Sequence, residues 1–323
     1  MPNKYFAAID VGTNSFHIII VKILENGSFK IIDKEREVIR LGSLNGNALS
    51  VISEEEISRA VKILSGFKKI ANFYNAEIKA IATSAVREAN NKVEFIKRIF
   101  DETGISIEVI EGSDEAKLIY LGISKALSLE KKKSLCIDIG GGSTEFILAE
   151  EGKIIFAESV KIGAVRLSKK FFDDFILTDQ SVGDCAAFVE RQILSNSKII
   201  SDGRFEIAAG SSGTVQSIAG MIKFNGKGSR GKSLNSFSFT QKELHIVAKE
   251  ILNSRTTAER LLIKGIEEKR ADIIPAGIII LSKIFDLFRI NELVVSDYAL
   301  REGIVLNFIS KNSNARKDYL FLC

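Results

Sequence analysis

The chain has 323 residues, of which 46% are hydrophobic and 27% are charged, and its formal net charge is +4. This length exceeds what one hydrophobic core usually serves, so we expect two domains in a chain that folds by itself. The charge is too small to indicate binding of duplex nucleic acid, which needs dense basic stripes. No segment reaches the roughly 20 apolar residues of a membrane span, and the N-terminus lacks a signal-peptide core, so the sequence predicts a cytoplasmic protein.

Neither the cysteines nor the local basic clusters identify a function. Cys136, Cys185 and Cys323 are odd in number, lie far apart and form no C-x-x-C pair, so we expect reduced thiols rather than a disulfide framework or a zinc site. A Gly/Ser-rich loop at 224–233 carries three basic residues. For that loop, guidance of a polyanion and plain solubility are equal alternatives.

The first half of the chain predicts a βββαβαβα order. Residues 5–38 alternate apolar runs with short turns, which is typical of three consecutive antiparallel strands, and Asn26-Gly27 is a strong hairpin signal. Ser53 and Glu56 form a capping box ahead of a helical pattern. The other elements expected here are a strand at 77–83, a helix at about 91–103, a strand at 105–110 and a helix from Asp114.

The second half repeats this order. Three strands are expected at 135–140, 145–152 and 153–162, followed by helices near 163–172 and 180–200. The later expected elements are a strand at 205–210, a helix from Val215, helix starts at Thr240 and Thr256, a long helix near 270–288, a strand at 292–297 and a helix from about Tyr298.

An internal repeat supports this reading. The segments IDVGTNSFHIIIV, from Ile9, and IDIGGGSTEFILA, from Ile137, superpose at an offset of 128 residues. The predicted fold class is therefore α/β, with two similar domains whose loops meet at a central cleft. We expect residues 1–124 plus about 299–323 to form the first domain and residues 125–298 the second. The matched loop positions are Asp10 and Asp138, Gly12 and Gly140, and Ser15 and Ser143.

The two matched loops predict phosphate chemistry. A strand that ends in Asp-x-Gly-x-x-Ser lets backbone N–H groups approach an anion, adds hydroxyl donors, and supplies a carboxylate for Mg²⁺ or its waters. One copy is a weak signal, whereas two copies with the same flanking strands favour a ligand site. The candidate substrate contacts are Asp10, Gly12, Thr13, Asn14 and Ser15 in the first loop and Gly140, Gly141, Gly142, Ser143 and Thr144 in the second.

A third Gly/Ser loop lies between a predicted strand and a predicted helix. Amides at a helix N-terminus bind anions, although a tight turn from strand to helix explains the same residues equally well on its own. Beside the other two loops the ligand-facing interpretation is favoured. Its candidate substrate contacts are Gly210, Ser211, Ser212 and Gly213.

The reactive groups are expected to be carboxylates. The chain has only two histidines, His17 and His245, and both fall inside predicted elements, so His-based triads and His metal sites are disfavoured. Oxygen-ligated Mg²⁺ is then the natural cofactor. Glu115, which follows a strand at the start of a helix, is the best candidate base, and complementing the helix dipole is its alternative role.

Two more charged residues are candidates at the same site. Glu145 follows the second loop and is a possible Mg²⁺ ligand, or else part of a solvated strand face. Arg87 follows a predicted strand and is placed to bind a phosphate oxygen.

The ordered motifs resemble the exopolyphosphatase/guanosine pentaphosphate phosphohydrolase (Ppx/GppA) family, a branch of the actin-like, ribonuclease H-like (ASKHA) superfamily. The resemblance covers nearly the whole chain, in a short two-domain form. Its carriers are IDVGTNSFH, RLG at 40–42, ATSAVREA, VIEGSDEAKLIYLG, IDIGGGSTEF, GAVRL, AAGSSGT, RADIIPAG and SDYALREG.

The resemblance implies a Mg²⁺-dependent enzyme that releases terminal phosphate from inorganic polyphosphate, the 5′ γ-phosphate of guanosine pentaphosphate, or both. It implies that Glu115 is the base that activates water, and that Asp138 and Glu145 position Mg²⁺. It also implies that Asp10, Gly140 and Ser143 line the phosphate site, while Arg87 and Arg270 contact substrate anions.

The chain departs from the family pattern in two places. It ends too early for the C-terminal HD-like domain of many members, which bears on long-chain grip, and Leu234-Asn235 stands where His-Gly is usual, which bears on substrate choice. A kinase or ATPase of the same superfamily and a slow polyphosphate or alarmone sensor stay open as alternatives. A homodimer is compatible with the short form, and no membrane partner is expected.

Overall fold

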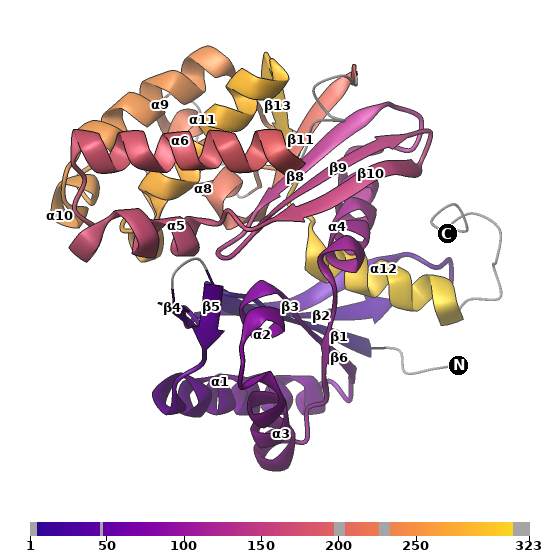
Figure 1. Ribbon diagram of the computed structural model, residues 1–323. Helices are drawn as coiled ribbons and strands as arrows, with labels where there is room; N and C mark the ends of the chain where they lie inside the picture. The colour runs from indigo at the N-terminus through magenta and orange to yellow at the C-terminus, as the bar shows by residue number, and fades with distance from the viewer. Residues whose placement is uncertain (1–4, 46–47, 197–203, 226–232, 313–323) are drawn as a thin grey trace. The chain divides into compact units, whose positions relative to one another are not determined.

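The computed structural model describes residues 5–45, 48–196, 204–225 and 233–312. The chain divides into two compact units, Met1–Gly122 with Leu300–Cys323, and Ile123–Ala299 (Figure 1). Within the described ranges, no helix is long and apolar enough to cross a membrane. The basic residues of the loop at 224–233, the end of the helix expected at 180–200, and Cys323 lie outside the described residues.

The first unit contains a mixed five-stranded sheet in the order β3-β2-β1-β6-β7. Strands β1 to β3 are antiparallel, as their apolar runs and the Asn26-Gly27 turn predict, while β6 and β7 run parallel to β1. Gly27 takes the left-handed conformation, with φ of 78°, that such a hairpin turn favours. The strands are β1 (Tyr5–Val11), β2 (Ser15–Ile23), β3 (Phe29–Val38), β6 (Glu77–Ala82) and β7 (Ile107–Val109), with a small hairpin of β4 (Ser43–Asn45) and β5 (Ala48–Val51).

The helices of the first unit follow local sequence signals, with one exception. The predicted capping box is present, since the Ser53 side chain accepts from the Glu56 N–H and the Glu56 carboxylate accepts from the Ser53 N–H. The exception is α2 (Ser84–Glu88), a five-residue helix that the sequence did not predict. The other helices are α1 (Glu54–Phe73), α3 (Lys92–Thr103), α4 (Gly112–Leu127) and α12 (Leu300–Asn312).

The second unit repeats this topology. Its six-stranded sheet has the order β10-β9-β8-β11-β13-β12, so the first five strands match the order of the first unit and β12 is added at the edge, antiparallel to β13. The internal sequence repeat is therefore a repeat of a whole mixed sheet, and the predicted α/β fold class is confirmed. The strands are β8 (Ser134–Ile139), β9 (Thr144–Glu150), β10 (Lys153–Val160), β11 (Ile207–Ser211), β12 (Ser238–Thr240) and β13 (Glu292–Val295).

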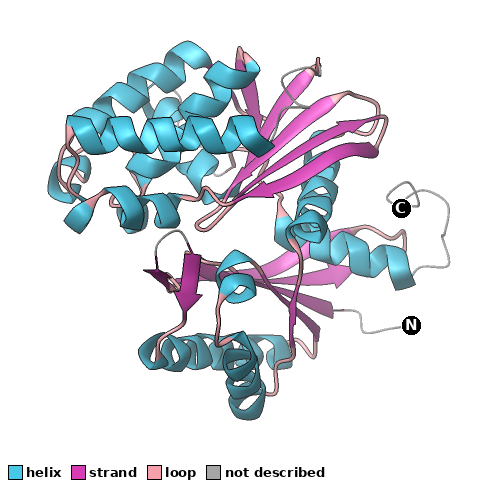
Figure 2. Cartoon of the chain, viewed as in Figure 1, coloured by secondary structure: helices cyan, strands magenta, loops and turns pink. Residues whose placement is uncertain are grey.

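A buried helix, α11 (Ile274–Phe288), organises the core of the second unit. It packs against α5 (Ala164–Phe171), α6 (Asp179–Asn196), α8 (Ser212–Asn225) and α9 (Gln241–Asn253) (Figure 2). It begins later than predicted, because residues Glu268–Arg270 form a 3₁₀ turn, and α8 begins at Ser212 rather than Val215. The predicted helix starts at Thr240 and Thr256 are confirmed, and each forms a capping box, at the start of α9 and of the short α10 (Thr257–Arg260).

The two described cysteines are structural. Cys136 and Cys185 are free and fully buried, and burial raises the pKa of each thiol to about 12. A thiol with such a high pKa is almost entirely protonated at neutral pH and is a poor nucleophile. The expectation of reduced thiols is therefore confirmed for these two residues.

Arg260 is a fully buried cation that joins loops of the second unit. Its guanidinium donates to the carbonyl oxygens of Ala271 at 2.6 Å, Phe175 at 2.7 Å and Ser254 at 3.0 Å, among other acceptors. Burial lowers the pKa of Arg260, while the negative charge of Asp272 opposes that shift. Because arginine stays protonated in proteins, this side chain acts as a charged clamp on backbone carbonyls.

We expect Arg260→Met to destabilise the fold by about 3 kcal/mol or more, because several buried carbonyls lose their donor together. The free energy of unfolding in urea measures this. Arg255→Met is the matched control, since the Arg255 side chain is 41% exposed and pairs with the exposed Asp179, and its loss should cost less than about 1 kcal/mol. Equal destabilisation by the two variants would contradict the clamp.

Candidate active site

The glycine loop between β8 and β9 is held from behind by the start of α5. The N–H of Ala164 donates to the Gly140 carbonyl, at 3.0 Å, and the N–H of Val165 donates to the Gly141 carbonyl, at 2.9 Å. The side chain of Arg166, which is 2% exposed, donates through Nε to the Gly142 carbonyl, at 2.6 Å. Three consecutive loop carbonyls are therefore bound by one helix start.

Because α5 binds the loop carbonyls, the N–H groups of the loop point away from α5. In a trans peptide the C=O and the following N–H point in opposite directions, so the N–H groups of Gly141, Gly142 and Ser143 are directed away from α5. In the described part of the chain none of these three groups has a hydrogen-bond acceptor. Successive unpaired N–H groups form a concavity that binds anions.

Close packing explains the glycine that precedes α5. A Cβ added at Gly163 would lie 2.4 Å from the Gly141 oxygen and 2.5 Å from the carbonyl carbons of Gly141 and Gly142. The backbone of Gly163 is extended, with φ of −137°, so the constraint is space and not conformation. The GAVRL segment is one of the motifs that carry the family resemblance, but neither Gly163 nor Arg166 was predicted to have a role.

Two carboxylates lie side by side on the sheet of the second unit. Asp138 and Glu145 are cross-strand partners on β8 and β9, so their side chains share one face. They are 6% and 1% exposed. The hydroxyl of Ser211 donates to Asp138 Oδ2 at 2.5 Å, and the hydroxyl of Ser159 donates to Glu145 Oε1 at 2.6 Å. Ser159 is a further residue that the sequence reasoning missed.

This pair fits a Mg²⁺ ion. Carboxylate oxygens that lie side by side on one face of a sheet are hard oxygen ligands of the kind that Mg²⁺ prefers. No group of three or more His, Cys, Asp or Glu side chains that could hold a metal occurs in the described ranges. Magnesium is usually bound by only one or two carboxylates, with waters and substrate phosphates completing its shell.

The first loop is built in the same way. The N–H groups of Ile39 and Arg40 both donate to the Asn14 carbonyl, each at 3.0 Å, so the segment after β3 holds this loop as the segment after β10 holds the other. The two loops also turn equally tightly. A Cβ added at Gly12 would lie 3.0 Å from the Ser15 carbonyl oxygen, and a Cβ added at Gly140 would lie 3.2 Å from the Ser143 carbonyl oxygen.

The first loop also contains an unsatisfied buried amide. Asn14 is 5% exposed, and neither its Oδ1 nor its Nδ2 has a partner among the described residues. A buried polar group without a partner is costly, so a site that leaves one in place points to a ligand. Next to it, the hydroxyls of Thr13 and Ser84 are 2.9 Å apart, which ties the loop to the start of α2.

Glu115 and Arg87 form an ion pair within the first unit. Arg87 Nη1 lies 2.9 Å from Glu115 Oε2 and also donates to the Ile110 carbonyl at 2.8 Å. Their side chains are 7% and 14% exposed, for Glu115 and Arg87 respectively. The unpredicted helix α2 carries Arg87, and the first turn of α4 carries Glu115. The two residues that were predicted separately as base and anion contact are thus direct neighbours.

The third loop forms the end of β11 and the start of α8. Ser212 has φ of 74°, and its hydroxyl donates to the Ile139 carbonyl at 2.5 Å. Arg270 lies against Gly213, where an added Cβ would come 1.8 Å from its Nη2. Arg270 also pairs with Glu267, with 3.2 Å between Nε and Oε2. The structure therefore brings Arg270 to this loop, and the Ser211 bond brings the loop to Asp138.

Asn235, in the position where the family usually has His-Gly, has a structural role. Its Nδ2 donates to the Ala126 carbonyl at 3.2 Å, and its Oδ1 accepts from the Asp297 N–H at 3.1 Å. Leu234 packs against the core of the second unit. Asn235 therefore joins the backbone at Ala126 to the backbone at Asp297.

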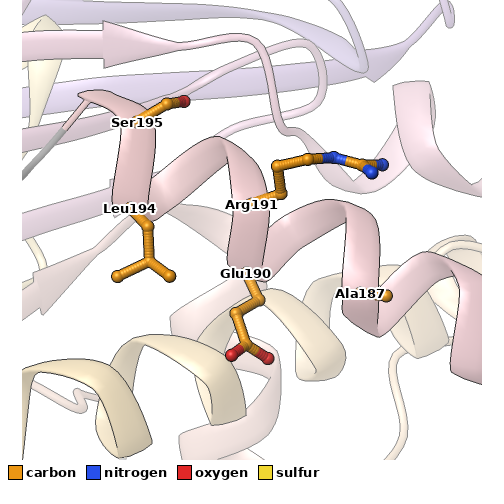
Figure 3. Close-up of a pocket in the computed structure, with 5 residues that line it drawn as sticks. All are labelled: Ala187, Glu190, Arg191, Leu194 and Ser195. Atoms are coloured by element: carbon orange, nitrogen blue, oxygen red, sulfur yellow. The ribbon is translucent and has the colours of Figure 1, made fainter.

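The second unit has a surface hollow along one of its helices. It has a volume of about 670 Å³ and is lined along α6 by Ala187, Glu190, Arg191, Leu194 and Ser195 (Figure 3). Glu190 pairs with Lys283 at 2.7 Å. None of the predicted site residues lines this hollow.

Comparison with known structures defines the class of protein. The crystal structure of an exopolyphosphatase from Cytophaga hutchinsonii is similar, with a TM-score of 0.87 and 30% sequence identity, and the match covers 96% of this chain and 99% of that one. The fold is therefore that of an exopolyphosphatase-like α/β protein.

Sequence comparison identifies the family. Residues 19–312 match the Ppx/GppA phosphatase family. A Haemophilus influenzae protein named "Putative exopolyphosphatase" is 32% identical, over 96% of this chain and 92% of that protein. A guanosine-5′-triphosphate,3′-diphosphate pyrophosphatase of Pseudoalteromonas atlantica is 29% identical, over 95% of this chain but only 59% of that protein. The chain belongs to the Ppx/GppA phosphatase family, as its motifs predicted.

Proposed function

We propose that the chain is a Mg²⁺-dependent phosphohydrolase that releases terminal orthophosphate from inorganic polyphosphate, the 5′ γ-phosphate from guanosine pentaphosphate, or both. The names of the two similar proteins support these two substrate classes.

The observation that carries the proposal is the row of N–H groups of Gly141, Gly142 and Ser143. They have no acceptor within the described residues, and the start of α5 fixes their direction. In phosphoryl transfer, negative charge develops on the oxygens of the transferred group. Hydrogen-bond donors that already point at this charge stabilise the transition state without any reorganisation. Asn14 adds an unsatisfied amide in the other loop.

Asp138 and Glu145 would hold Mg²⁺. When bound, the ion neutralises charge on the phosphate oxygens. The side chains of Ser159 and Ser211 would keep the two carboxylates in place through their hydrogen bonds. Arg270, against Gly213, would contact a substrate anion.

Glu115 would accept the proton of the attacking water. A loose phosphoryl transition state demands little of the nucleophile beyond position and removal of its proton. The ion pair with Arg87 holds one carboxylate oxygen, Oε2, and so limits the rotation of the group. Arg87 has further guanidinium N–H groups with which it could reach a substrate oxygen.

Phosphate release, measured side by side on long polyphosphate, short polyphosphate and guanosine pentaphosphate, tests the proposal. We expect orthophosphate as a product from at least one of the three, and loss of at least tenfold of the rate when a chelator removes Mg²⁺. Transfer of phosphate from ATP to a small acceptor would instead indicate a kinase. Tight binding of these compounds without release of phosphate would indicate a sensor.

A further inference from the structure

His17 connects a substrate-loop hydroxyl to an arginine in the first unit. Its Nε2 lies 2.8 Å from the hydroxyl oxygen of Ser15, and its Nδ1 lies 3.3 Å from Arg301 Nη1. His17 is on β2 and Arg301 is in the first turn of α12, and α12 packs against β1 and β2. Ser15 is 5% exposed.

The donors in this chain can be assigned from chemistry alone. A guanidinium has N–H donors and no acceptor, so His17 Nδ1 must accept from Arg301. A protonated ring would instead place two donors and two positive charges 3.3 Å apart. With Nδ1 as the acceptor, the ring hydrogen lies on Nε2, which makes Nε2 the donor to Ser15 Oγ.

The hydroxyl hydrogen of Ser15 is then left for another acceptor, and no other described side chain or carbonyl accepts it. We propose that Arg301 and His17 are positioning residues that set the Ser15 hydroxyl as a hydrogen-bond donor to a phosphate oxygen. This rests on the proposed function in one respect, namely that Ser15 meets phosphate. Hydrogen bonds in series polarise each other, so the charge of Arg301 strengthens the last donor.

The two repeats differ at the position of His17. The offset that matches Asp10 to Asp138 also matches His17 to Glu145. Asp10 and His17 are cross-strand partners, and so are Asp138 and Glu145. The second unit thus has two carboxylates where the first has one carboxylate and an imidazole backed by a guanidinium. The second arrangement suits a cation, and the first suits direct contact with an anion.

The tautomer can be measured without any activity. His17 and His245 are the only histidines, so a protein labelled with ¹⁵N-histidine gives two rings in a long-range ¹H–¹⁵N spectrum. His245 is on the exposed side of α9, and a His245→Gln variant assigns the signals. We expect His17 to be the Nε2–H tautomer in the wild type and a mixture of tautomers in Arg301→Met. A His17 that carries its hydrogen on Nδ1, or on both nitrogens, would overturn the proposal.

Binding of inorganic tripolyphosphate, measured by calorimetry, tests the role of the donor. His17→Phe should weaken binding about tenfold, which is the typical effect of one hydrogen bond to a charged group, and His17→Gln should restore most of it because its amide can donate from a similar place. In a Ser15→Ala background, His17→Phe should have no further effect. Losses that add in the double variant would show that His17 is only structural and would overturn the proposal.

These measurements separate the inference from the proposed function. Failure of the wild-type protein to bind tripolyphosphate would overturn phosphate as the ligand, and with it the proposed function. The orientation of the Arg301–His17–Ser15 chain is decided by the spectrum alone.

Discussion

Replacement of Glu115 by glutamine is expected to lower the turnover number for phosphate release by about 10²-fold or more. Glutamine has the same shape but cannot take a proton from water, so the variant loses the proposed base. The amide oxygen can still accept from Arg87, whose Nη1 is 2.9 Å from the carboxylate, so we expect the first turn of α4 to keep its structure. The dissociation constant for orthophosphate should change little.

The nearby Glu111 supplies a matched control. It is exposed and directly precedes α4, and Glu111→Gln makes the same chemical change one helical turn away. We expect this variant to retain wild-type turnover. Thermal unfolding of both variants would show that the fold is intact. If Glu115→Gln turned over polyphosphate and guanosine pentaphosphate at the wild-type rate, another group would have to be the base.

Much of the fold could be predicted because its signals are local. The capping boxes at Ser53, Thr240 and Thr256 depend on two residues three positions apart, and all three are present. The repeat of the Asp-x-Gly-x-x-Ser loops revealed the paired sheets without any knowledge of tertiary contacts. By contrast, α2 has only five residues, which is too short for a periodic pattern, and α8 begins within residues that the sequence assigned to a turn.

The site was less predictable because its supports are distant in the chain. The residues of the loops were visible as motifs. The residues that support the second loop, Gly163 and Arg166, follow the next two strands of the chain and gave no signal of this role. Ser159 reaches Glu145 only through the strand register, and a serine on an edge strand carries no signal of its own. The place of His17 inside a predicted strand disfavoured a catalytic or metal-binding role, and its contacts with Ser15 and Arg301 became visible only in the fold.

Replacement of Gly163 by alanine is expected to lower kcat/KM by about 10²-fold or more, because displacement of a positioning group by about 1 Å is enough for such a loss. The new methyl group would lie 2.4 Å from the Gly141 oxygen, and the atoms it meets are backbone atoms that cannot rotate away. Either α5 or the loop must therefore move, and the carbonyls of Gly140 and Gly141 lose their donors. The N–H groups of the loop are then no longer held in the direction that the proposed phosphate site requires.

Gly183→Ala separates this effect from a general loss of stability. Gly183 is in α6 with nothing within 4 Å of an added Cβ, so alanine there should leave kcat/KM unchanged and stabilise the helix by about 0.5–1 kcal/mol. Gly163→Ala should cost about 1–3 kcal/mol through overpacking, which leaves a folded protein on which binding can be measured. Calorimetry with tripolyphosphate should then show weaker binding as well as slower release. A folded Gly163→Ala variant that bound and cleaved at wild-type levels would mean that the loop does not depend on α5, and that its N–H groups do not form the phosphate site.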